Sequence, residues 1–325
     1  MNLDALDESP RLLLQAELKP VQGTRFQPTG FPDLGAAEYT VADGRHMLLL
    51  ESTQSMANRL EASCWDEGRG HLVPTLHGLP YVKSVLPDGS ITASILEAHR
   101  LNSPYLFDAT GYEQILDAVG FTKDAPFNRR KLALALLRFD PNSLLHGIFL
   151  EKIGGVVRLP RALSAFIEAE DVTVASAGGV KFDRVQPTST GENTKYGSAK
   201  EGYGNVPYHR DEYTANRIVA YFNLDLALLR GIGLNGAALR MMTTLALYKI
   251  RRFLNTGLRL RTACDLDLVG EVEVNRPEGF ELPTMSALED ALPKLIEECS
   301  SLFNEPRVLE LTYAPAKKAA RTKQS

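Results

Sequence analysis

Alternating apolar and polar residues predict the strands of this protein. In residues 11–19, Leu14, Ala16 and Leu18 fall on one face between polar neighbours, and the run stops at Pro20. A period of two is typical of a strand buried on one face. The same alternation predicts further strands, at residues 217–229, 258–268 and 308–313.

Helical spacing dominates other parts of the chain. In residues 52–65, Met56, Ala57, Leu60 and Cys64 form one apolar stripe. The opposite face is small and polar, with one arginine: Ser52, Ser55, Asn58 and Arg59. Similar patterns predict helices at residues 112–119, 128–139, 161–169 and 236–254 and from residue 286 onward. The helix over 236–254 is expected to end in the basic residues Lys249, Arg251 and Arg252.

One-sided strands mixed with amphipathic helices indicate an α+β fold, with helices on one face of a sheet. The other face of the sheet is then open and available for binding. We find no internal repeat.

Residues 186–208 form a Gly-rich polar stretch without apolar periodicity. The stretch and its flanks interleave cations with tyrosines: Lys181, Arg184, Lys195, Lys200, Arg210, Tyr196, Tyr203 and Tyr208. Cations suit phosphates and aromatic rings suit bases, so the composition fits single-stranded nucleic acid. A solvated insertion without function is the alternative.

Charge is segregated along the chain. The net charge is −4, but residues 120–262 hold 21 Lys and Arg against 12 Asp and Glu, while both flanks are acidic. A basic middle in an acidic chain suggests a local site for a polyanion. Mutual neutralisation of these segments in the fold is the alternative.

Several chemistries find little support. The three cysteines, Cys64, Cys264 and Cys299, fit buried apolar positions better than a disulfide or zinc framework. The set Cys64, His71 and His77 matches no closed metal site. No apolar run is long enough for a membrane span and no secretory signal is present, so we expect a cytoplasmic protein that binds neither metal nor cofactor.

A G-x-G-x-x-G motif at residues 231–236 lies between a predicted strand and a predicted helix, as in dinucleotide-binding folds. No acidic residue follows about 20 positions later to hold a ribose. We therefore favour a glycine-rich turn, with a nicotinamide oxidoreductase as a weaker alternative.

Six stretches together resemble one protein family: residues 11–35, 51–60, 95–105, 140–147, 158–164 and 259–265. They resemble the RAMP-type backbone subunit of the type I-G (formerly type U) CRISPR surveillance complex, Cascade. The resemblance covers residues from about 11 to about 313.

The resemblance implies a modified ferredoxin-like (RRM-like) palm with inserted fingers and a thumb, for which residues 186–208 are the candidate. The acidic N-terminal arm at 1–10 and the basic tail at 314–325 fall outside the resemblance, and we expect the tail to be disordered. It implies a non-catalytic subunit that binds CRISPR RNA, stacks with copies of itself, contacts other Cascade subunits and presents the guide to target DNA. Some relatives cleave RNA, so a metal-dependent ribonuclease is the alternative.

The residue patterns and the resemblance together give a set of expected RNA contacts. They are Arg25, Phe26, Ser52, Gln54, Ser55, Asn58, Arg59, Arg100, Asn102, Arg158, Arg161, Lys181, Arg184, Tyr196, Tyr203 and Arg210. Arginines and small polar side chains are suited to phosphates, and the aromatic residues to bases.

Overall fold

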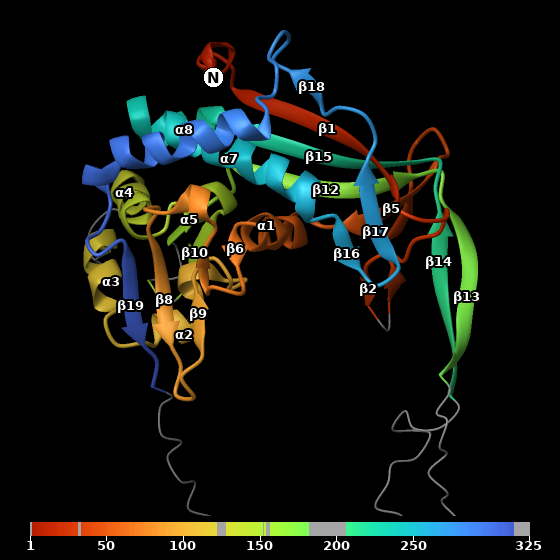
Figure 1. The fold of residues 1–325 in the computed structure, drawn as a ribbon, viewed down its shortest axis with the longest axis horizontal. Coiled ribbons are helices and arrows are strands. Elements are labelled where there is room, and N and C mark those ends of the chain that lie inside the picture. The colour runs from red at the N-terminus through yellow and green to blue at the C-terminus, as the bar shows by residue number, and fades with distance from the viewer. Residues whose placement is uncertain are drawn as a thin grey trace, which may run out of the picture.

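The computed structural model describes residues 2–31, 34–121, 128–151, 153, 157–181 and 206–314. Its centre is an antiparallel sheet of eight strands (Figure 1), in the order β16-β17-β1-β15-β12-β5-β4, with β18 also paired to β1. The strands are β1 (Arg11–Pro20), β4 (Glu38–Thr40), β5 (His46–Glu51), β12 (Leu163–Glu170), β15 (Arg217–Asp225), β16 (Arg259–Arg261), β17 (Cys264–Leu268) and β18 (Glu273–Arg276).

Strand β1 confirms the predicted alternation. Leu12, Leu14, Ala16 and Leu18 are at most 3% exposed. In the register with β15, Leu14 lies opposite Phe222. The buried face of β1 therefore joins the apolar core.

Helices α1 (Thr53–Ala62), α7 (Gly236–Thr256) and α8 (Met285–Glu298) pack beside the sheet, with α1 against β12 and α7. The shorter helices are α2 (Pro104–Phe107), α3 (Glu113–Val119), α4 (Arg129–Phe139), α5 (Asn142–His146) and α6 (Leu226–Gly231). The predictions for residues 52–65, 112–119, 128–139 and 236–254 are thus confirmed to within a few residues. None of the helices in the described ranges is long and apolar enough to cross a membrane.

Two groups of strands extend to the same side of the central sheet, at its opposite ends (Figure 1). One is the sheet β19-β8-β9, and the other is the hairpin β13-β14. Their bounds are β8 (Tyr81–Val85), β9 (Ile91–Ala93), β19 (Val308–Thr312), β13 (Thr173–Lys181) and β14 (Val206–Thr214). Three small ladders complete the fold: β2 (Gly30–Phe31) with β3 (Gly35–Ala36), β6 (Trp65–Asp66) with β7 (His71–Leu72), and β10 (Ile148–Leu150) with β11 (Val157–Leu159).

Three sequence predictions are corrected by the structure. Residues 161–169 are mostly strand β12, in which buried positions alternate, and not a helix. The strand predicted over 217–229 ends at Asp225, whose side chain caps α6 by accepting from the Leu228 N–H at 2.8 Å. The strand predicted over 258–268 is the hairpin β16-β17, which turns at Ala263 with φ +59°.

The glycine motif lies in a turn, as favoured, but the element before it is a helix and not the expected strand. Gly231 ends helix α6, and Gly236 begins helix α7. The motif therefore joins two helices, whereas the dinucleotide fingerprint follows a strand of a parallel sheet. All three cysteines are free and buried, as predicted.

The open face of the sheet carries ion pairs between neighbouring strands. Arg217 donates to Glu17 at 3.0 Å, and Arg45 donates to Glu170 at 3.0 Å. Paired charges leave little net field for a polyanion. These pairs give no support to the expectation that this face supplies the binding surface, and the predicted cations in the described ranges lie on other elements.

Candidate nucleic-acid interface

Helix α1 presents the polar face that the sequence predicts. Met56, Ala57 and Leu60 are buried in the core. Ser52 is the N-cap, and its side chain accepts from the Ser55 N–H at 3.3 Å. Ser52, Ser55, Asn58 and Arg59 are all half-buried, which leaves their polar atoms at the edge of the surface.

A buried carboxylate underlies this helix face. Glu51 is 1% exposed, and it pairs with Arg59 at 2.9 Å and with Arg261. Ser55 also donates to Glu51 through its hydroxyl. Two guanidinium groups share one carboxylate, so the cluster keeps one net positive charge. Glu51 therefore holds Arg59 in place, and the excess positive charge of the cluster is left for an anion.

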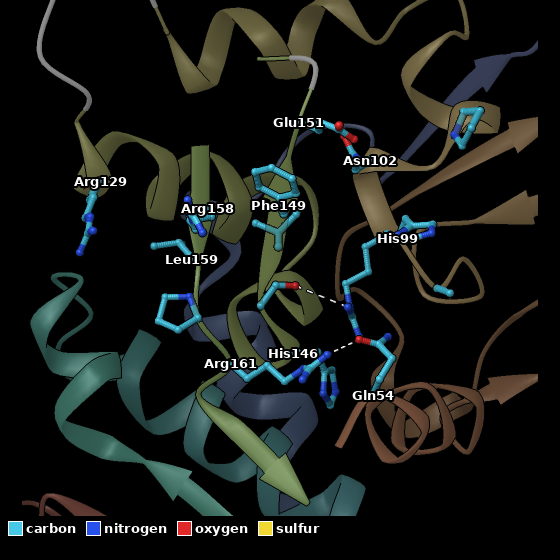
Figure 2. A pocket seen from close by; sticks show the side chains of 16 residues that line it. Gln54, His99, Asn102, Arg129, His146, Phe149, Glu151, Arg158, Leu159 and Arg161 are labelled. Atoms are coloured by element: carbon cyan, nitrogen blue, oxygen red, sulfur yellow. Dashed lines mark hydrogen bonds between the residues drawn. The ribbon is translucent and has the colours of Figure 1, made fainter. Parts of the chain in front are cut away.

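A cavity of about 830 Å³ opens beside the N-terminal end of α1 (Figure 2). It brings together five of the predicted contacts from three separate parts of the chain: Gln54, Arg100, Asn102, Arg158 and Arg161. We call this cavity the arginine pocket. Among the described residues that line it, Glu151 is the one acidic side chain.

Arg161 joins the pocket to helix α1. Its Nη1 donates to the Thr53 hydroxyl at 3.4 Å, and its Nη2 donates to Gln54. Gln54 in turn donates to Asn58 at 3.2 Å. The predicted residues Gln54, Asn58 and Arg161 thus form one connected set.

Arg100 is a correction to the predicted contacts. It is 4% exposed, and its Nε and Nη2 donate to Glu61 at 2.8 and 2.6 Å. A bidentate, buried pair leaves this guanidinium no free edge for RNA. Arg100 therefore forms part of the pocket floor and does not grip a phosphate.

The pocket floor also contains His146, and the buried Lys249 lies behind it. His146 and Lys249 are 1% and 0% exposed, and Lys249 Nζ lies 3.1 Å from His146 Nε2. Burial, together with Lys249, Arg100 and Arg161, lowers the pKa of His146 well below its ordinary value. The imidazole is therefore neutral near pH 7.

Arg25 and Arg210 form a second group. Both pair with Glu212, Arg25 at 3.5 Å, and the Glu212 side chain is 6% exposed. They line one depression together with Gly23 and Asp265. Arg210 also lines a neighbouring depression with Arg261 and Gln27.

Phe26 is a second correction. Its side chain is 1% exposed, and its backbone exchanges two hydrogen bonds of 2.9 Å with Tyr213 on β14. A buried ring cannot stack on a base, so Phe26 anchors the hairpin instead. Lys181 lies exposed at the end of β13.

Part of the predicted thumb lies outside the described residues, which resume at 206. Arg184, Tyr196, Tyr203 and the tail from 315 are among the predictions that fall there. Residues 206–208 of the predicted loop belong to strand β14.

Sequence reasoning missed several residues of the arginine pocket. Phe149 is 44% exposed, and the Arg158 guanidinium lies 5.7 Å from its ring centroid. Arg129 also lines the pocket. It begins α4 with Arg130 and Lys131, and such a run of three cations can be detected in the sequence. Lys249 was expected at a helix end, but α7 continues to Thr256 and buries it.

The comparisons with known proteins are consistent with a CRISPR context. The family model described as CRISPR-associated protein GSU0053 (Cas_GSU0053) matches residues 12–174, half of the chain. No curated protein matches the sequence.

Three solved structures show weak similarity to this chain, with TM-scores below 0.5. A chain described as "CRISPR RNA-guided surveillance complex, pre-nicking" has a TM-score of 0.39 at 15% identity, covering 79% of this chain and 74% of that chain. A chain of a "CRISPR RNA-guided surveillance complex" has a TM-score of 0.35 at 16% identity, covering 87% and 75%. Csc2 from Thermofilum pendens has a TM-score of 0.32 at 12% identity, covering 92% and 79%. From the match of the family model, the chain belongs to the Cas_GSU0053 family of CRISPR-associated proteins.

Proposed function

We propose that this protein is a non-catalytic, RNA-binding backbone subunit of a type I-G CRISPR surveillance complex. Membership in a CRISPR-associated family supports the proposal. In it, copies of the chain stack head to tail along the guide RNA in the cytoplasm, beside other Cascade subunits. Target DNA then pairs with the exposed guide bases.

The order of the central strands supports an RRM-like palm. Strands β17-β1-β15-β12 are neighbours in this order, and all of them pair antiparallel. In chain order they are β1, β12, β15 and β17, and helices α1 and α7 come after β1 and β15. This is the order of a β-α-β-β-α-β unit. We assign the fingers to the segments around β8, β9 and β10, and the thumb to the β13-β14 hairpin with the residues that it leads to.

The observation that carries the proposal is a series of arginines linked through shared partners and shared depressions. The arginine pocket reaches Thr53 and Gln54 through Arg161. Beside them, Glu51 pairs with both Arg59 and Arg261. Arg261 and Arg210 line one shared depression. Arg210 and Arg25 line the next one. We call this continuous set the cationic track: Arg25, Arg210, Arg261, Arg59, Arg161 and Arg158. A line of guanidinium groups suits the regularly spaced phosphates of extended RNA.

A matched pair of variants tests this function. The chain is purified with a repeat-spacer RNA, and absorbance at 260 and 280 nm is followed through gel filtration at low and high salt. We expect RNA to elute with a large species that dissociates at high salt. Arg158→Ala/Arg161→Ala should release RNA at lower salt than the parent protein.

The control Arg240→Ala/Arg276→Ala removes the same charge from exposed sites off the track. If both double variants release RNA at the same salt concentration, the cationic track is refuted. An RNA-free peak for the parent protein would refute the function itself. The alternative, a metal-dependent ribonuclease, predicts RNA that shortens with Mg²⁺ and stays intact with a chelator.

A further inference from the structure

The floor of the arginine pocket holds a donor without an acceptor. Lys249 Nζ lies 3.1 Å from His146 Nε2. Burial lowers the pKa of Lys249, whereas the nearby Glu61 and Asp140 favour its ammonium form. An ammonium at this position donates to Nε2, which leaves the imidazole proton on Nδ1. Nδ1 is buried and has no partner within the described residues. A buried N–H of this kind costs stability unless an acceptor fills the site.

Positive charge surrounds that donor. The pKa of His146 is lowered by burial and by Lys249, Arg100 and Arg161. Figure 2 shows the Arg161 guanidinium beside the His146 ring, and the buried Arg161 Nε has no partner among the residues that the structure describes. An oxyanion placed here would accept from both groups and would be attracted by the nearby cations.

The upper wall has a different character. Phe149 lines the pocket and is 44% exposed, and the Arg158 guanidinium lies over its ring at 5.7 Å. Asn102 adds a buried Oδ1 that has no partner in the described ranges. An aromatic face with an amide beside it is what a nucleobase requires for stacking and edge contacts.

The size of the cavity fits this combination. A volume of about 830 Å³ exceeds the needs of a bare phosphate and lies in the range of small-molecule sites. We propose that the pocket binds one nucleotide of the RNA chain, with its phosphate at Arg161 and His146 Nδ1 and its base against Phe149. This inference rests on the proposed RNA-binding function and adds a site that encloses a single nucleotide.

Small probes test the two halves of the pocket separately. Titration calorimetry of the RNA-free full chain is carried out with AMP, adenosine and inorganic phosphate. We expect saturable AMP binding. Arg161→Met should weaken AMP and phosphate by about tenfold, because a charge-assisted hydrogen bond is lost. Phe149→Ala should weaken AMP and adenosine by about tenfold and leave phosphate unchanged.

Both positions are partly exposed, so these variants should fold, and Arg240→Ala serves as the control. The nucleotide site is overturned if AMP does not saturate the parent protein at millimolar concentration, or if all variants bind AMP with equal affinity. A competition experiment identifies the source of the nucleotide: a short single-stranded RNA should displace AMP. AMP that stays bound under saturating RNA overturns the assignment to the RNA chain. RNA binding without AMP binding removes the pocket proposal alone, whereas AMP binding without RNA binding removes the proposed function.

Discussion

Arg100 and Glu61 form a buried bidentate pair, with hydrogen bonds of 2.8 and 2.6 Å between side chains that are 5% and 1% exposed. Removing one partner would leave the other charge buried alone. We expect Arg100→Met to lower the free energy of unfolding by about 3–5 kcal/mol. Urea unfolding checks this value. The double variant Arg100→Met/Glu61→Leu should recover part of the loss, and a double variant no better than the single one would contradict the pairing.

Gly147 lies where the pocket backbone is most crowded. Its φ is +77°, and a Cβ there would come within 2.9 Å of the Leu159 carbonyl oxygen and 3.0 Å of the Arg161 nitrogen. Gly147→Ala should therefore cost about 3 kcal/mol or more. Gly44→Ala is the matched control, because Gly44 has φ +91° and open space around it. If thermal unfolding shows the same loss of stability in both variants, the contact of the added Cβ with the Leu159 carbonyl oxygen is unimportant.

His146 should make stability depend on pH. Its pKa is lowered in the fold, so between that pKa and 6.5 the unfolded chain binds more protons and stability falls as the pH falls. The slope contributed approaches about 1.4 kcal/mol per pH unit. Burial raises the pKa of Glu61 and Asp140, which acts in the opposite direction.

The comparison with His146→Gln therefore isolates the histidine. Unfolding measured between pH 5 and pH 7 should have a smaller acid loss in this variant. His209→Gln, at a side chain that is 71% exposed, should keep the parent slope. An identical slope in His146→Gln would show that the neutral, buried state is wrong.

Ser52 has two separable roles. As the N-cap of α1 it contributes about 1 kcal/mol, which Ser52→Ala should remove. Ser52→Asp keeps a capping oxygen and should retain the stability of the fold. The added negative charge should weaken RNA binding in a filter-binding assay. If Ser52→Asp binds RNA as well as the parent protein, phosphates do not approach this end of α1.

Arg25 should contribute to the salt dependence of RNA binding. Its side chain is 56% exposed beside Glu212, so its loss should not unfold the protein. Arg25→Ala should reduce the log-log salt slope by about 0.7, the value for one phosphate on a single strand. Fluorescence anisotropy at several salt concentrations measures the slope. An unchanged slope would place Arg25 off the RNA path.

The sequence predicts most of the central fold because local periodicity and burial agree there. Strand β1 and helices α1 and α4 each bury one regular stripe of apolar residues, whereas α7 is buried on all sides from Met241 to Ile250. Strand β12 was mistaken for a helix because its inward residues include the small Ala165 and Ala169, which fit either period. The β13-β14 hairpin was missed because most of β13 is exposed and has no alternation.

The candidate site was predicted as a set of cations but not as a geometry. Arg158 and Arg161 could be chosen by type, and they do meet in one pocket. Whether an arginine is free or paired depends on distant partners, such as Glu61 for Arg100, 39 positions away. The same holds for Lys249 and His146, which are 103 positions apart.

The bond between Phe26 and Tyr213 has a mechanical consequence. It fastens the base of the β13-β14 hairpin to the loop that holds Arg25, through two backbone hydrogen bonds. Nine paired residues in each strand make a lever of about 30 Å. A force on the far end of this lever is transmitted through Phe26 to the adjacent Arg25. Bending of the hairpin should therefore move Arg25, and displacement of Arg25 should in turn bend the hairpin.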